Sequence, residues 1–159
     1  MDNQVAGAFV IDKQIIFRSY VLDSYQTWVG YGSCIVKSMN SQLIDIGQAI
    51  VEALNESKLE SDLEEPITSE EMAKQRKYLL KTAKVTSHRK LVQNSVYCDI
   101  CRNGNSFEFT PTHNGGTRGD KKGHQFLRKS IVVPGIASYE ELGSAFLECI
   151  SLCTSIYNT

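Results

Sequence analysis

The sequence predicts an α/β (α+β) fold, a single two-layer domain with helices packed on a mixed, mainly antiparallel β-sheet. Three observations predict it. Strand-like patterns dominate residues 5–36 and 91–109, amphipathic helical patterns occupy residues 43–54 and 138–156, and two stretches of strand and helix echo one another. A length of 159 residues is typical of one domain, so we expect residues 1–159 to fold as one unit.

The N-terminal part of the chain is strand-like. Val5–Ile11 and Ile15–Leu22 are rich in β-branched and aromatic residues, and the three residues between them are typical of a tight turn. A third run, Tyr25–Val36, is aromatic and contains Gly30 and Gly32. Glycines inside a strand pattern predict either a bulge or a turn that divides the run in two.

The period then changes to that of a helix. Ser41 is a candidate N-cap, and the helix is expected to end near Ser57. Its apolar face consists of Leu43, Ile46, Ile50, Val51 and Leu54. A second, more exposed helix is expected from about Ser69 to Lys84, with Thr68 or Ser69 as its cap.

The C-terminal half returns to strands before a last helix. Residues 91–109 are predicted to form a hairpin whose turn contains Asn103-Gly104. A polar, glycine-rich loop follows at 112–123, then a short strand at 131–134. The last amphipathic helix is expected from Ser138 to near Ile156.

The echo joins two stretches at a constant offset of 96 residues. Ile35-Val36 corresponds to Ile131-Val132, and Ile46-Gly47 corresponds to Leu142-Gly143. Glycine inside a helix costs about 1 kcal/mol relative to alanine. Its presence twice therefore predicts that each helix passes close to other backbone there, most simply that of the sheet, with both helices on one face.

Composition limits the function classes. Lys and Arg number 17 against 18 Asp and Glu, a net charge of -1 that argues against an obligate nucleic-acid binder. An odd count of 5 cysteines and a start without a signal-peptide pattern favour a reducing compartment, the cytoplasm. No apolar run approaches the ~20 residues that would span a bilayer, so no membrane partner is expected.

The charges are distributed in blocks. Residues 56–71 carry seven carboxylates and one base, whereas 74–90 and 118–129 are basic. Complementary potentials accelerate encounter and select partners, so the acidic block is a candidate surface for a cationic protein. A solubilising loop followed by a helix N-terminus explains the same charges equally well.

Other candidate sites are weaker. Cys98 and Cys101, with His113 and His124, offer soft metal ligands, but alternation places the two cysteines on opposite faces of a strand, so neither a metal nor a cofactor is expected. The three histidines are expected in loops. The glycine-rich residues 113–119 could cradle a phosphate, but they lack the Gly-Lys-Ser/Thr ending and do not lead directly into a helix. A mobile surface loop is the favoured interpretation.

The segment Ser138–Leu147 (SYEELGSAFL) resembles a motif near the C-terminus of contact-dependent growth inhibition (CDI) immunity proteins, and Ile131–Pro134 and Leu43–Leu54 fit the same scheme. The resemblance implies a cytoplasmic, non-enzymatic protein that neutralises the C-terminal domain of a cognate CDI toxin. Toxins paired with such relatives look like nucleases, some of them metal-dependent DNases. In some relatives a toxin hairpin adds to the sheet of the immunity protein.

We therefore expect the acidic block to cover the substrate-binding surface of a nuclease toxin, without direct contact to nucleic acid. Tight inhibition also needs apolar anchors, because charge determines rate and selectivity more than affinity. Two rivals stay open: a small cytosolic enzyme that uses residues 113–118, and a nucleic-acid adaptor that uses the basic residues 74–90 and the loop 113–123. The candidate contacts are Glu60, Asp62, Glu64, Glu65, Glu70 and Glu71.

Overall fold

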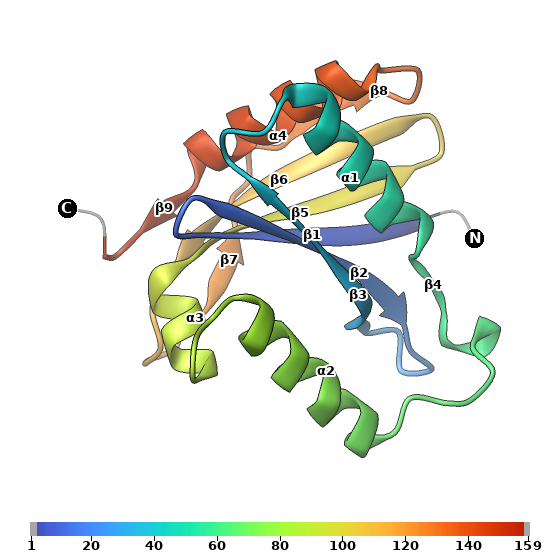
Figure 1. The fold of residues 1–159 in the computed structure, drawn as a ribbon, viewed down its shortest axis with the longest axis vertical. Helices are drawn as coiled ribbons and strands as arrows, with labels where there is room; N and C mark the ends of the chain where they lie inside the picture. Colours follow the sequence, from blue (N-terminus) through green and yellow to red (C-terminus); the bar gives the residue numbers. More distant parts are fainter. Residues whose placement is uncertain (1–2, 158–159) are drawn as a thin grey trace.

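The computed structural model describes residues 3–157 and has one central sheet, with strand order β3-β2-β1-β5-β6-β7 (Figure 1). The short strands β4, β8 and β9 add to β2, β6 and β6. All pairs are antiparallel except β2·β4 and β6·β9, so the predicted mixed, mainly antiparallel sheet is confirmed. The strands are β1 Asn3–Ile11, β2 Gln14–Leu22, β3 Trp28–Ser38, β4 Lys58–Leu59, β5 Val96–Asn103, β6 Ser106–Asn114, β7 His124–Phe126, β8 Ile131–Pro134 and β9 Thr154–Ser155.

Helices cover both faces of this sheet (Figure 1). The helices α1 (Leu43–Asn55) and α4 (Tyr139–Leu152) pack side by side on one face. Their apolar sides bury the main core, in which the rings of Phe17 and Phe146 lie 5.2 Å apart. The helices α2 (Ser69–Thr82) and α3 (His88–Asn94) lie on the other face, over a smaller cluster that includes Ile16 and Leu91.

The two halves of the chain share one element order around the centre of the sheet. The first half runs β1-β2-β3-α1, and the second runs β5-β6-β8-α4 with the short β7 added between β6 and β8. β1 and β5 pair in the middle. The echoed residues fall at equivalent places in β3 and β8 and in α1 and α4. The echo therefore corresponds to a structural repeat, and α2 and α3 are inserted between its copies.

The two echoed glycines lie where α1 and α4 cross. A Cβ on Gly47 would collide with the backbone of Tyr139, the first residue of α4, and a Cβ on Gly143 would collide with the backbone of Leu43, the first residue of α1. The predicted close approach is confirmed. The expected neighbour was wrong, because each glycine faces the other helix and not the sheet.

The turns and caps agree with the sequence at several positions. Asp12 and Lys13 adopt left-handed φ angles of 49° and 62° in the tight turn between β1 and β2. The glycine-containing run forms a bulge, since the β2–β3 register shifts between Arg18 and Tyr20 and Gly32 has φ 96°. Thr68 caps α2, accepting from the Glu71 N–H at 3.1 Å.

Three expected boundaries were wrong. Ser41 does not cap α1, because Gln42 holds that position without a side-chain bond and Ser41 Oγ accepts from the Ser38 N–H instead. Residues 91–94 belong to α3 and not to the hairpin. The last helix ends at Leu152, because the chain then pairs with β6 as β9.

Asp99 on β5 is a half-buried carboxyl group, and we expect its replacement to stabilise the protein. Burial first, and then the charge of Glu108, raise the pKa of Asp99 to about 6. The folded protein therefore holds the proton more tightly than the unfolded chain, and stability is lost as pH rises from about 4 to 6. We expect Asp99→Asn to raise the free energy of unfolding by roughly 1–2 kcal/mol at pH 7.5, discounted for partial exposure, and by nothing at pH 4.

Urea unfolding at the two pH values measures this difference. Asp120→Asn, on an exposed loop, is the matched control and should change stability at neither pH. An equal gain at both pH values would show that the charge of Asp99 is not its cause.

Candidate functional site

The acidic segment forms a defined structure between α1 and α2. Ser57 anchors its start, since this buried hydroxyl accepts from the Val5 N–H at 2.9 Å and donates to the Tyr20 carbonyl at 2.8 Å. The chain then adds β4 beside β2, makes a 3₁₀ turn at Glu60–Asp62 and reaches Thr68 in an extended form. The segment is thus held against the end of the sheet.

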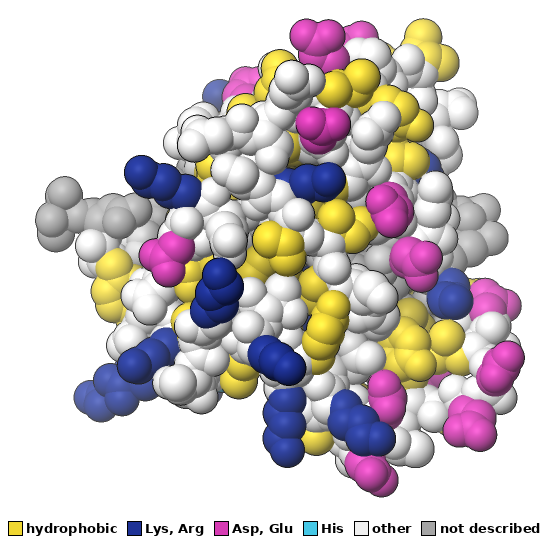
Figure 2. Space-filling model, in the orientation of Figure 1, with side chains coloured by type: hydrophobic (Ala, Val, Ile, Leu, Met, Phe, Trp, Pro, Cys, Tyr) yellow, Lys and Arg dark blue, Asp and Glu magenta, His cyan; other side chains and the backbone are white. Residues whose placement is uncertain are grey.

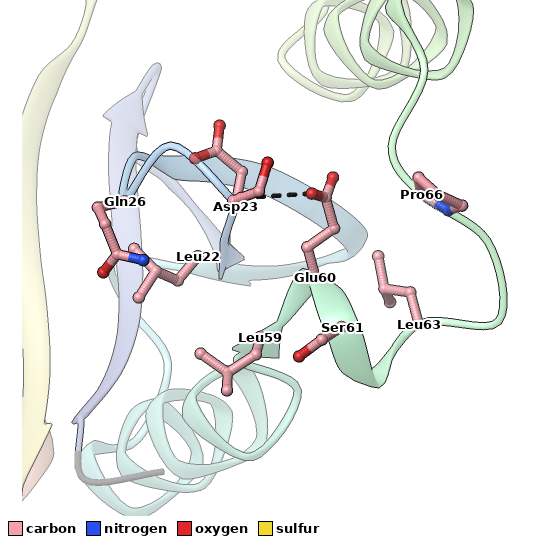
Figure 3. Close-up of a pocket in the computed structure, with 9 residues that line it drawn as sticks. Leu22, Asp23, Gln26, Leu59, Glu60, Ser61, Leu63 and Pro66 are labelled. Carbon is pink, nitrogen blue, oxygen red and sulfur yellow. Dashed lines mark hydrogen bonds between the residues drawn. The ribbon is translucent and has the colours of Figure 1, made fainter.

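Glu60 fastens this segment to the turn between β2 and β3. Its carboxylate accepts from the Ser24 N–H at 3.3 Å and from the Ile67 N–H at 3.1 Å. Figure 3 shows the side chain of Glu60 pointing to that turn, with a dashed line for the first bond. Both carboxylate oxygens of Glu60 therefore form hydrogen bonds that hold the segment in place against the turn.

Two adjoining hollows open on the segment. The first has a volume of about 400 Å³. Its apolar walls are formed by Leu22 of β2, Leu59 of β4, and Leu63 and Pro66 of the segment (Figure 3). The second, about 570 Å³, shares Leu63 and Pro66 with the first and is lined by four carboxylates. These are Asp62, Glu64, Glu65 and Glu71. We call the two hollows together the acidic site.

The structure brings together most of the predicted contact residues. Glu60 lines the first hollow, whereas Asp62, Glu64, Glu65 and Glu71 line the second. Glu70 lies exposed in the first turn of α2 and lines neither hollow.

The sequence did not point to the apolar walls or to Tyr31 of β3, which lines the second hollow. The aromatic run 25–36 was the available signal for Tyr31.

The surface around the acidic site is electrically polarised. Asp and Glu side chains gather at the lower right of Figure 2, over the segment that leads into α2, and Lys and Arg gather over the remainder of α2 and over α3. Lys58 is the one base among the described residues that line the second hollow. The acidic site therefore suits a cationic ligand.

The acidic site lies beside an edge of the sheet. β3 is an edge strand of the sheet, and Tyr31 belongs to it. Tyr78 of α2 covers part of this edge, since its hydroxyl accepts from the Cys34 N–H at 3.3 Å. On the side of that contact where Tyr31 and the acidic site lie, an extended chain could pair with β3.

The metal and nucleophile candidates of the sequence are dispersed. Cys98 is buried under α4, with its Sγ 2.7 Å from Sγ of Cys149, and Cys101 is three residues further along β5, on the opposite face. Within residues 3–157 no cluster of three or more metal-ligating side chains is formed.

The prediction that the three histidines lie in loops was wrong, because all three lie in helices or strands. His113 lies in β6 with Nδ1 2.7 Å from Thr154 Oγ1, His124 lies in β7, and His88 begins α3. Burial first, and then the charge of His88, lower the pKa of His124 to about 4.

Over residues 3–157, no helix has the length and apolarity needed to cross a bilayer.

Comparisons with known proteins give a family and a fold. A family model described as CdiI, CDI immunity protein, matches residues 6–153. A protein of unknown function from Neisseria meningitidis, NMB0488, has a similar structure with a TM-score of 0.77 and 14% identity over 95% of both chains. A CdiA-CT/CdiI toxin and immunity complex from Yersinia pseudotuberculosis matches with a TM-score of 0.75 and 17% identity, covering 97% of this chain and 99% of that one. No curated protein matches the sequence.

Proposed function

The chain belongs to the CdiI family of CDI immunity proteins, and we propose that it binds the C-terminal domain of a cognate CDI toxin through the acidic site. The family's role is toxin neutralisation. A similar fold occurs in a toxin and immunity complex, which supports a toxin C-terminal domain as the partner. Inhibition by binding needs no catalysis and no cofactor, and it takes place in the cytoplasm, where the toxin meets its target.

The observation that carries this proposal is the grouping of four carboxylates around one hollow next to an apolar one. Carboxylates attract a cationic surface and increase the rate of encounter. The apolar walls supply what charge does not, a desolvated pocket that can hold an anchoring side chain of the partner. One surface thus offers both requirements of a tight protein complex.

We propose further that the toxin is a nuclease whose substrate-binding surface becomes covered. A nuclease presents Lys and Arg to phosphates, so a carboxylate-rich surface competes for the same cations. In this mechanism the immunity protein contacts the toxin and no nucleic acid. The free part of the β3 edge gives an extended toxin segment a place to pair beside the acidic site.

Charge reversal at the second hollow tests the proposal. The probe is the C-terminal domain of the cognate toxin, which we expect to be encoded immediately upstream of this chain. We expect Glu64→Lys with Glu65→Lys to lower the association rate constant about tenfold in low salt and to reduce protection of cells that express the toxin. Surface plasmon resonance at two salt concentrations measures the rates.

The matched control is Glu52→Lys with Glu148→Lys, two exposed acids on α1 and α4. It makes the same change of net charge away from the acidic site and should retain most of the wild-type rate. Equal losses in both double variants would contradict the acidic site as the contact. Failure of the wild-type chain to bind the toxin domain would contradict the proposed partner.

A further inference from the structure

A third hollow, lined by cations, lies at the far end of the helical face formed by α2 and α3. It measures about 500 Å³, and its cations are Arg89 of α3 and Arg118 and Lys122 of the loop 115–123. The other lining residues are His88, Val92, Gly116, Thr117 and Gly123. The two arginines come from segments far apart in the sequence. Only the tertiary structure brings these cations around one space.

The loop has a fixed shape at its neck. The Gly115 N–H donates to the Gly123 carbonyl at 2.8 Å, and the Gly123 N–H donates to the Gly116 carbonyl at 2.7 Å. Gly116 and Gly123 have φ angles of 86° and 85°, in the left-handed region where residues with a Cβ are strained. The glycines therefore close the loop into one conformation that carries Arg118 and Lys122.

A buried asparagine fastens this loop to α3. Nδ2 of Asn114 donates to the carbonyls of Val92 and Ser95, at 2.5 and 3.1 Å. Oδ1 of the same side chain accepts from the Gly116 N–H at 3.0 Å. Arg89 and the loop cations are thus held on two walls that are bonded to each other, and the hollow is formed before any ligand arrives.

We propose that this hollow, the basic site, binds a phosphoryl group carried by a nucleotide-sized molecule or as free phosphate. Guanidinium groups pair with phosphate oxygens through two parallel hydrogen bonds, which are charge-assisted and among the strongest in proteins. A volume of about 500 Å³ is within the range of small-molecule pockets.

A nucleic-acid chain fits the observations less well. The basic residues of α2 lie outside the hollow, and the hollow has the volume of a small-molecule pocket. The proposal does not depend on toxin binding, because the basic and acidic sites share no residue.

Titration with inorganic phosphate, AMP and adenosine tests the basic site on the whole protein. We expect amide shifts of Gly116, Thr117 and Gly123 in ¹H–¹⁵N spectra to saturate with phosphate and with AMP, and not to respond to adenosine. Tighter binding of AMP identifies a nucleotide as the ligand, and equal binding identifies free phosphate. Arg89→Gln with Arg118→Gln should weaken binding at least about tenfold, as expected for the loss of charge-assisted bonds.

Lys74→Gln with Lys81→Gln, two exposed residues of α2 outside the hollow, is the control with the same change of net charge. An equal loss in this control would overturn the proposal, since binding would then follow net charge. Binding of a single-stranded oligonucleotide without any response to phosphate or AMP would also overturn it. So would tighter binding of a polyglutamate peptide than of phosphate.

Discussion

Gly143→Ala should lower the free energy of unfolding by about 1–2 kcal/mol, although alanine is the better helix former. A Cβ at this position collides with the backbone of Leu43, which cannot move aside as a flexible side chain would. Overpacking of this kind costs about 1–3 kcal/mol or more, and here it exceeds the gain of about 1 kcal/mol in helix propensity. Urea unfolding monitored by circular dichroism measures the change.

Gly47→Ala should behave in the same way, because Gly47 meets the backbone of Tyr139 at the same crossing. Once one alanine has separated α1 from α4, the second should cost less, so the double variant should lose less than the sum of the single variants. Ser144→Ala, at an exposed position next to Gly143, is the control and should be neutral or slightly stabilising. A stabilising Gly143→Ala would contradict the close crossing of the two helices.

Asn114→Ala should destabilise the protein by about 3 kcal/mol. The side chain is buried and makes the three hydrogen bonds that join α3 to the loop 115–123. Its loss leaves two carbonyls and one N–H without this partner, at about 1 kcal/mol or more each. For a chain of 159 residues this corresponds to a fall in Tm of roughly 10 °C, which calorimetry measures.

Asn94→Ala is the matched control for this prediction. Asn94 lies exposed at the end of α3, near the same bonds but without a part in them. We expect its loss to change Tm by little. If both variants had the same Tm, the bonds of Asn114 would not hold α3 and the loop together.

The sequence predicted those elements whose signals are local. Alternation in Val5–Leu22 and the Asn103-Gly104 turn depend on residues a few positions apart, and both features form as expected. The last helix begins at its predicted cap, where Ser138 and Glu141 form a capping box. α3 escaped prediction because it is only seven residues long and its apolar pair, Leu91 and Val92, also fits a strand.

The acidic site was only partly predictable. The sequence shows that the carboxylates are clustered, but it does not show which of them line a hollow and which bond to the backbone. Glu60 bonds to two backbone N–H groups, Glu70 lies outside both hollows, and the apolar wall includes Leu22 from a strand formed 38 residues before Glu60. Which carboxylates line a hollow depends on where the chain returns to the sheet, and no local pattern contains that.

By itself, the sequence determined the strand and helix periods, the charge blocks and the repeated glycines. The tertiary structure decided what those glycines touch, and it alone brought Arg89 together with Arg118 and Lys122. The physical reason is the difference in sequence separation between the interacting residues. Periods, turns and caps arise from interactions within a few residues, whereas a helix crossing or a hollow depends on how distant surfaces pack.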